Sequence, residues 1–227
     1  MKINNIETED MDIELLTREI GVPEITTQAE WLDGRLEPHI EEQFFKFKPI
    51  ELEMLLEKFN DNDAEKEISK LVALAGKCSI EFDDLDFKYV GYLTDVGRNK
   101  ITIGRYDLTL SFMVAYGMAS RVTQSITTSG SVVLDSSMTT PVQVIVTSTT
   151  ARGSITINGL GHKIVLNNVK ANVPVVIDGE TGLITESNMN NFKNYESWGF
   201  PRLEVGTNLI TVDSGVKLEL AFNPRWL

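Results

Sequence analysis

The sequence predicts a mainly β protein of two domains, in which one α-helix accompanies the strands of the first domain. Short runs that alternate apolar and polar residues recur along the chain, as expected of half-buried strands. Turn-forming pairs such as Asn-Gly, Asp-Gly and Ser-Gly separate these runs in the second half. Only residues 63–75 show the apolar spacing typical of an amphipathic helix.

Composition changes near residue 120, and this change predicts the domain boundary. Residues 1–118 hold 25 acidic and 13 basic residues, so they carry the whole net charge of −12, whereas residues 119–227 hold 8 of each. The second half is instead rich in Thr, Ser, Val, Asn and Gly. With 227 residues, of which 42% are hydrophobic, the chain can bury a core in each half. We therefore expect domains at residues 1–120 and 121–227.

The first domain is predicted to begin with strands. Residues 11–17 and 40–48 have strand patterns, and residues 31–35 form a turn between them. In residues 50–59, apolar residues alternate with glutamates, which favours a strand, although Glu, Leu and Met also favour helices. Alternation is the stronger pattern over a short run, so we predict a strand.

The predicted helix spans residues 63–75. Asn62 can cap its N-terminus with Glu65 as the capping-box partner, and Gly76 follows as a natural C-terminal residue. One apolar stripe is formed by Ile68, Leu71, Val72 and Ala75.

The helix is followed by a predicted hairpin and a long strand. Residues 80–82 and 87–93 form the hairpin across the acidic turn at residues 83–86, and residues 106–116, which alternate throughout, are the clearest strand of this half. Cys78, the only cysteine, excludes an internal disulfide and is expected to be a small core residue.

Hairpins without a helix predict an antiparallel β-sandwich for the second domain. Apolar β-branched runs at residues 132–134 and 142–146 are further strands. The predicted hairpins pair residues 154–157 with 163–166 across Asn158-Gly159, 173–177 with 183–185 across Asp178-Gly179, and 209–212 with 216–222 across Ser214-Gly215.

The sequence shows no catalytic or metal-binding pattern. His39 and His162 are the only histidines, so with Cys78 they form neither a nucleophile pair nor a zinc set. The acids of residues 61–67 lack the glycine of a calcium loop and suit a helix N-terminus, while those of residues 83–86 suit a turn. We therefore expect no enzyme activity, no cofactor and no metal.

The charge and hydropathy of the chain limit its partners. An acidic surface disfavours phosphate backbones and anionic membranes, so we expect no sequence-specific nucleic-acid binding. The chain has no apolar run of transmembrane length, and its acidic N-terminus lacks the apolar core of a signal peptide.

Two tryptophans leave a carbohydrate-binding alternative open. Trp198 and Trp226 could stack on sugar rings in a carbohydrate-binding sandwich. We favour packing roles for both: Trp226 as a core residue of the last strand, and Trp198 beneath the loop at Pro201.

Residues 177–227 carry a pattern that resembles a known family. Its residues are Trp198, Pro201, Leu203, Gly206, Asn208, Pro224, Arg225 and Trp226. Their order is similar to that of the C-terminal domain in the distal tail proteins of long-tailed, non-contractile bacteriophages. Residues 153–168 resemble the central hairpin of that family, and the strand–helix–strand order of the first half resembles its N-terminal domain.

The resemblance implies a structural role in the virion, at the phage tail tip, after assembly in the host cytoplasm. It implies an N-terminal β-sandwich with one helix that forms a hexameric ring, and a galectin-like C-terminal β-sandwich. The implied partners are the tail tube protein, the tape-measure protein, a tail-associated lysin or hub protein and a receptor-binding protein. The alternatives are a carbohydrate-binding module that contributes to host adhesion, and a hydrolase appendage.

The charge distribution adds a hypothesis about the channel of such a ring. Because the negative charge lies in the ring-forming half, several acids are candidates to line a lumen through which DNA passes, with residues 83–86 among them. The alternative is that these acids lie outside and serve solubility.

Overall fold

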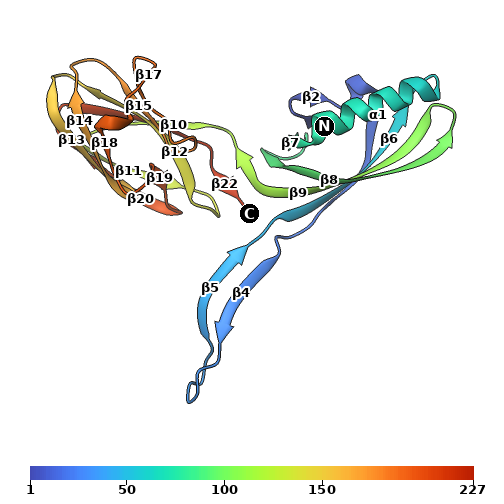
Figure 1. Cartoon of the computed structure of the whole chain (residues 1–227), viewed down its shortest axis with the longest axis horizontal. Helices are drawn as coiled ribbons and strands as arrows, with labels where there is room; N and C mark the ends of the chain where they lie inside the picture. The colour runs from blue at the N-terminus through green and yellow to red at the C-terminus, as the bar shows by residue number, and fades with distance from the viewer. The chain divides into compact units, whose positions relative to one another are not determined.

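The computed structural model describes every residue from Met1 to Leu227, and the chain forms two compact units (Figure 1). Unit 1 comprises Met1–Met118 with Leu227, and unit 2 comprises Ala119–Trp226. Strands dominate both units, and α1 (Asp61–Ala75) is the only α-helix, so the predicted mainly β fold class is confirmed. That helix is too short and too polar to span a bilayer.

Unit 1 is built on a sheet whose strands run in the order β2-β1-β7-β8-β9-β6-β3. Their bounds are β1 Lys2–Ile3, β2 Ile6–Glu7, β3 Ile13–Ile20, β6 Lys48–Glu57, β7 Lys77–Glu81, β8 Phe87–Thr102 and β9 Arg105–Ala119. The predicted hairpin and long strand are present as β7, β8 and β9. Residues 50–59 lie mostly in β6, which confirms the strand prediction.

The alternation in β6 places its apolar side chains on one face. Ile50, Leu52, Met54 and Leu56 are at most 1% exposed, whereas the glutamates between them face solvent. Helix α1 covers this core with Ala64, Ile68, Leu71 and Ala75, which are all buried. Cys78 belongs to the same cluster, as predicted.

The ends and the buried stripe of α1 differ from the prediction. Asn60, not Asn62, is the N-cap: its backbone is extended, and its side-chain oxygen accepts a hydrogen bond of 2.9 Å from the backbone N–H of Asp63. Gly76 keeps right-handed backbone angles because β7 begins at once after it. Val72 is 37% exposed, since it lies beside the narrow stripe that faces the sheet.

Two predicted strands of unit 1 have shifted bounds. The first, β3, begins at Ile13 because a 3₁₀ turn, η1 (Glu9–Met11), precedes it. The strand predicted at residues 40–48 ends at Phe45 as β5 (His39–Phe45), which pairs with β4 (Ile25–Glu30). The hairpin formed by β4 and β5 continues from the ends of β3 and β6 (Figure 1).

Unit 2 is a sandwich of two antiparallel sheets. The first has the order β10-β21-β12-β15-β16-β17, with β19 beside β12, and the second has the order β11-β20-β13-β14-β18. The bounds in the first are β10 Val122–Thr127, β12 Thr140–Ser148, β15 Val175–Asp178, β16 Ile184–Glu186, β17 Met189–Asn190, β19 Arg202–Leu203 and β21 Val216–Phe222. Those in the second are β11 Ser129–Leu134, β13 Arg152–Leu160, β14 His162–Val169, β18 Tyr195–Glu196 and β20 Gly206–Val212. A 3₁₀ turn, η2 (Phe192–Asn194), and a short last strand, β22 (Arg225–Trp226), complete the chain.

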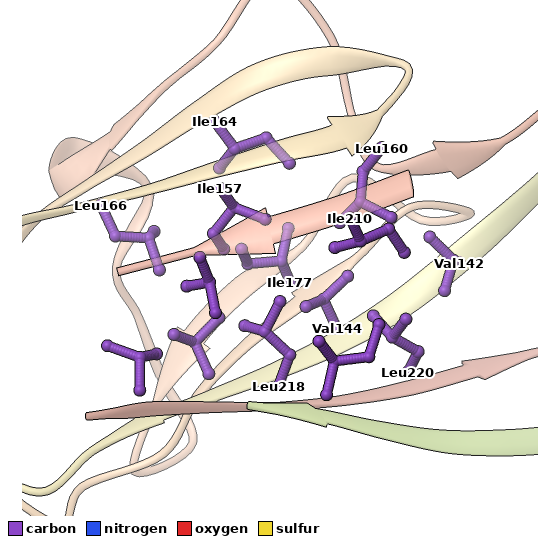
Figure 2. Packing of buried hydrophobic residues seen from close by; sticks show 14 of the residues in the cluster. Val142, Val144, Ile157, Leu160, Ile164, Leu166, Ile177, Ile210, Leu218 and Leu220 are labelled. Atoms are coloured by element: carbon purple, nitrogen blue, oxygen red, sulfur yellow. The ribbon is translucent and has the colours of Figure 1, made fainter. Parts of the chain in front are cut away.

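The apolar side chains of the two sheets meet in one core. Figure 2 shows Val144, Ile177 and Leu218 from one sheet directed toward Ile157, Ile164 and Ile210 from the other. All six are fully buried. Each such side chain contributes about 1.5–3 kcal/mol through its removal from water, so this layer stabilises the sandwich.

Two of the three predicted turns of unit 2 are wrong in detail, while the turn at Asp178-Gly179 is present between β15 and β16. The β13–β14 turn lies at Gly161 rather than at Asn158-Gly159, which sits in a bulge of β13. At Gly159, a Cβ atom would lie 2.0 Å from the carbonyl oxygen of Leu209, so glycine allows β20 to approach. The third pair, β20 and β21, is no hairpin, because these strands belong to different sheets and residues 213–215 cross between the sheets.

Candidate assembly surfaces

The β4–β5 hairpin exposes an unusual amount of apolar surface. Every residue of β5 is exposed, and the two strands form a two-stranded sheet of their own. Its large apolar residues, each 40% to 96% exposed, are Ile25, Trp31, Leu32, Leu36, Ile40, Phe44 and Phe45. A two-stranded hairpin is at best marginally stable alone in water. A hairpin with these side chains therefore fits a surface on another molecule.

A second group of exposed apolar side chains lies where the chain after β6 meets the turn between β8 and β9, since the Lys58 N–H donates a hydrogen bond of 2.8 Å to the Gly104 carbonyl. Phe59, Ile101 and Ile103 are 95%, 49% and 70% exposed. Asp61, the first residue of α1, holds this turn in place. Its carboxylate accepts hydrogen bonds from the Gly104 N–H at 2.9 Å and from the Tyr106 hydroxyl at 3.1 Å. These apolar side chains thus project from a rigid support.

The electrostatics of Asp61 agree with this geometry. Lys100 Nζ lies 2.5 Å from the second carboxylate oxygen. The hydrogen bond from Gly104, and then the Lys100 ammonium, hold the pKa of Asp61 below its ordinary value. Asp61 therefore works as an anchor between the helix N-terminus and the β8–β9 turn, and not as a cation ligand.

The outer face of the unit 1 sheet carries a row of carboxylates. Glu19 on β3 lies directly opposite Glu51 on β6, and Glu53 is two residues further along β6. Thr17 donates a hydrogen bond of 2.8 Å to Glu53, but Glu14, Glu19 and Glu51 form no ion pair. Like charges directly opposite each other destabilise a sheet, so this acidic face does not serve the stability of the fold.

Two of the three acids in the turn between β7 and β8, Asp83 and Asp84, have cationic partners. Arg18 donates two hydrogen bonds to Asp84, one of 2.6 Å from Nη1, and this contact lowers the pKa of the Asp84 carboxyl. The N-terminal amine lies 3.2 Å from Asp83. This turn is therefore a weaker source of negative potential than the acidic face of the sheet. The chain has no group of three or more acidic, His or Cys side chains that could hold a metal ion.

Most residues of the C-terminal pattern have structural positions in unit 2. Leu203 is fully buried, Pro201 is buried, and Gly206 has a φ of 90°. Asn208 closes the same turn, because its side chain accepts from Glu204 N–H at 2.9 Å and donates to the Glu204 carbonyl at 2.8 Å. These positions explain why the turn needs a glycine and an asparagine.

The end of the pattern ties the last residues to the start of unit 2. The Pro224 carbonyl accepts a hydrogen bond of 2.9 Å from the Ala119 N–H, and Arg225 lies 2.6 Å from Glu180. Trp226 is half-buried and belongs to neither hydrophobic cluster, so its predicted place in the core is wrong.

Trp198 is placed differently from the prediction. It is 98% exposed, and does not pack beneath the Pro201 loop. The loop around it is braced, because the Tyr195 and Phe200 rings stack with centroids 5.9 Å apart and the Tyr195 hydroxyl donates to the Gly199 carbonyl at 2.6 Å. The packing role falls to Tyr195 and Phe200, which leaves Trp198 free to contact another molecule.

Sequence reasoning missed the surfaces of unit 1. The exposed hairpin could have been suspected from apolar residues that lie among six acids in residues 24–46. The Asp61 anchor has no local signal, since its partner Gly104 lies 43 residues away in the sequence.

Comparisons with known proteins give matches among solved structures alone. No family model and no curated protein matches the sequence. The crystal structure of the phage SPP1 Dit protein, described as a hub of the adsorption apparatus in phages that infect Gram-positive bacteria, matches with a TM-score of 0.77 and 13% identity. The match covers 99% of this chain and 98% of that one.

A second match is the phage P2 baseplate in its activated conformation, with a TM-score of 0.54 and 8% identity over 92% of this chain and 90% of that one. At these identities the likeness concerns the fold. The resemblance inferred from the C-terminal pattern thus holds at the level of structure, and the chain has, from end to end, the fold of the SPP1 Dit hub protein.

Proposed function

We propose that this chain is a structural protein of a phage tail tip, a hub that forms a hexameric ring and joins the tail tube to the tail-tip or baseplate proteins. The observation that carries the proposal is the structural match over 99% of the chain, which includes both units. The proposed partners are the tail tube protein, the tape-measure protein, a tail-associated lysin or hub protein and a receptor-binding protein.

The β4–β5 hairpin supports the ring. A ring arises when one surface of a subunit binds a different surface of the next subunit, and this repeats until the circle closes. The hairpin supplies one such surface, because its apolar residues are exposed on both strands. Mass photometry of the purified chain, alone and with tail tips, tests the ring: a strict monomer that also fails to join tail tips contradicts the proposal.

The acidic face of the unit 1 sheet supports a channel through which DNA passes. We place the row of Glu14, Glu19, Glu51 and Glu53 on the inner wall of the ring. Carboxylates repel phosphates, whereas a basic wall would hold them with a strong salt dependence. A ring structure with a neutral or basic lumen, and these glutamates on its rim, rejects this assignment.

The proposed role is structural and not enzymatic. It agrees with a fold shared with hub and baseplate proteins, and the wall and interface functions above need no reactive group. Hydrolysis assays on peptidoglycan, glycosides and nucleotides test it, and turnover that is lost on substitution of a single Asp or Glu contradicts it.

A carbohydrate-binding contribution to host adhesion is the second candidate. Trp198 favours it, since a fully exposed indole on a braced loop is suited to stack on a sugar ring. Glycan-array binding by the isolated chain, lost in Trp198→Ala, tests this candidate separately from the ring.

A further inference from the structure

The two sides of the unit 2 sandwich differ in how they are protected from pairing with other strands. On one side the sheets end in β17 and β18, which are two residues long. The second of these contains Glu196 and follows Lys193 of η2. On the other side the sheets end in β10 and β11, which have six residues each. Short strands and charges are the usual protection of a sheet edge, so the side with β10 and β11 is the open one.

This open side also lacks the other features that block strand pairing. Residues 122–134 contain no charged residue and no proline, although 24% of the chain is charged. Neither strand has a bulge, since the register of β10 with β21 and of β11 with β20 is continuous. The unit 1 sheet offers a contrast: its edge strand β3 carries Arg18 and Glu19, and its register shifts between Leu15 and Thr17. The uncharged, regular edge of unit 2 therefore has the properties of a surface that pairs with another strand.

The hydrogen bonds around β11 show which of its backbone groups face outward. The Val212 N–H donates to the Thr128 carbonyl at 2.8 Å, so Thr128 directs this group toward β20. In an antiparallel pair every second residue bonds to the neighbouring strand. The residues of β11 that direct their backbone groups away from β20 are therefore Ser129, Ser131 and Val133. Gln124 of β10 agrees with this assignment, because its side-chain amide donates to the Ser131 carbonyl at 3.0 Å. Apart from that bond, the row faces outward at the end of its sheet.

The side chains beside this row favour an uncharged partner. Val133 is 65% exposed, and Leu209, which lies diagonal to it on β20, is 68% exposed. Ser129 and Ser131 are small and exposed, so they leave room for a strand alongside β11. A charged side chain placed against Val133 would lose water without gaining an ion pair. A β-branched or aromatic side chain in the same place would bury apolar surface and form a favourable cross-strand pair.

We propose that β11 accepts an additional strand from another protein, an extended and uncharged segment with β-branched or aromatic side chains at alternate positions. The backbone of this segment bonds to the outward groups of Ser129, Ser131 and Val133, and one of its N–H groups replaces Gln124 at the Ser131 carbonyl. Main-chain hydrogen bonds supply the affinity, and the side chain that covers Val133 supplies the selectivity.

The proposed ring decides between a foreign strand and a second copy of this chain. Every subunit of a hexamer carries one β11, so pairing of β11 with itself would link each ring to several others and produce open aggregates instead of a closed particle. A strand from a different protein covers each edge once and leaves the ring separate. The choice of partner therefore rests on the proposed function, whereas the open edge is a property of the single chain.

The test measures peptide binding to the full chain by fluorescence anisotropy. The probe is a short, end-capped, labelled peptide of alternating Thr and Val, and a peptide of alternating Thr and Glu is its charged counterpart. We expect the Thr-Val peptide to bind with a dissociation constant on the order of 0.1 mM, and the Thr-Glu peptide to bind at least about tenfold more weakly. Residue-resolved hydrogen–deuterium exchange should then show that the Thr-Val peptide slows the amides of Ser129, Ser131 and Val133, the alternation expected of an added strand.

Two variants close the edge and keep the sheet. Ser131→Pro removes an N–H that is directed away from β20, and Val133→Lys places a charge on the edge. Each should weaken binding of the Thr-Val peptide at least about tenfold and leave the melting temperature of the chain unchanged. Leu209→Lys is the matched control for the lysine variant, because Leu209 is similarly exposed but its strand is paired on both sides. This control should retain binding. If Ser131→Pro fails to fold, Val133→Lys and its control carry the test.

The contrary outcomes are equally specific. Absence of Thr-Val binding, equal binding of both peptides, or binding that both edge variants retain overturns the inference. Equal loss in Leu209→Lys and Val133→Lys would assign the binding to the face of the sheet and not to its edge. Slow exchange of the three amides in the free chain, increasing with its concentration, would mean that a second copy occupies the edge, and also overturns the inference. None of these results bears on the ring, which mass photometry reports.

Discussion

The side-chain carboxylate of Asp61 accepts a hydrogen bond of 2.9 Å from the backbone N–H of Gly104, and this contact joins the first turn of α1 to the β8–β9 turn. Gly104 has a φ of 70°, and a Cβ atom there would lie 2.0 Å from the Lys58 carbonyl oxygen. The helix cap and the turn are therefore built as one unit, which presents Phe59 and Ile103 to solvent.

We expect Gly104→Ala to destabilise unit 1 by more than about 1 kcal/mol, because the new side chain needs both a left-handed backbone and space that the Lys58 carbonyl occupies. Gly76→Ala is the matched control. Gly76 has right-handed angles, and an added Cβ atom meets only ordinary contacts at 3.8 Å. Thermal denaturation should show a clear loss for the first variant and none for the second. Equal effects in both would contradict the role given to Gly104.

The Asp61 anchor predicts a pH-dependent contribution to stability. The pKa of Asp61 is lowered in the folded chain, first by the Gly104 N–H and then by Lys100. Its contribution is therefore present above the unfolded pKa of about 3.9 and is lost as the pH falls through the lower, folded pKa. Asp61→Asn should lower the melting temperature at pH 7, and the difference in melting temperature from the wild type should shrink in acid.

Asp95→Asn serves as the control, because Asp95 is exposed and forms no ion pair. A difference that is constant with pH would exclude the charge as its cause.

Cys78 should be unreactive in the folded chain. It is 3% exposed, and burial raises the pKa of its thiol to about 11, so almost no thiolate is present at pH 8. Iodoacetamide should label the native protein slowly and the urea-unfolded protein fast. Equal rates in both states would show that strand β7 opens readily.

Removal of residues 223–227 should weaken unit 2 without emptying its core. The deletion removes the hydrogen bonds of Asn223 and Pro224 to Ala119 and the ion pair of Arg225 with Glu180. Each hydrogen bond contributes about 0.5–1.5 kcal/mol. Phe222→Ala should cost more, about 3–5 kcal/mol, because Phe222 is 4% exposed in the core. Urea denaturation of both variants ranks the two effects, and the reverse order would mean that Trp226 contributes more to stability than its half-buried position indicates.

The elements that could be predicted from the sequence are those whose formation depends on residues close together in the chain. The alternation of β6 and β9, the amphipathic helix and the turn at Asp178-Gly179 depend on neighbouring residues, and the structure contains them all. The crossing at residues 213–215 was missed because a Ser-Gly turn looks the same whether it joins strands of one sheet or of two. Trp198 was misplaced because its loop is packed by Tyr195 and Phe200, and pattern alone does not rank three aromatic residues within six positions.

The last prediction concerns the hairpin in assembly. In the double variant Ile40→Ser, Phe44→Ser, two exposed apolar side chains of β5 are removed while the backbone pairing with β4 is kept. Because neither residue belongs to the core of unit 1, the subunit itself should keep its stability within about 0.5 kcal/mol. Each ring interface, in contrast, should lose about 2–4 kcal/mol if these residues are its anchors, and every interface of the ring weakens at once. Mass photometry should therefore show hexamers for the wild type and single subunits for the variant at the same concentration.

Val22→Ser is the matched control, since Val22 is 82% exposed but lies outside the hairpin strands. Rings that persist in the double variant, or that disappear equally in the control, would remove the hairpin from the interface and direct attention to Phe59 and Ile103.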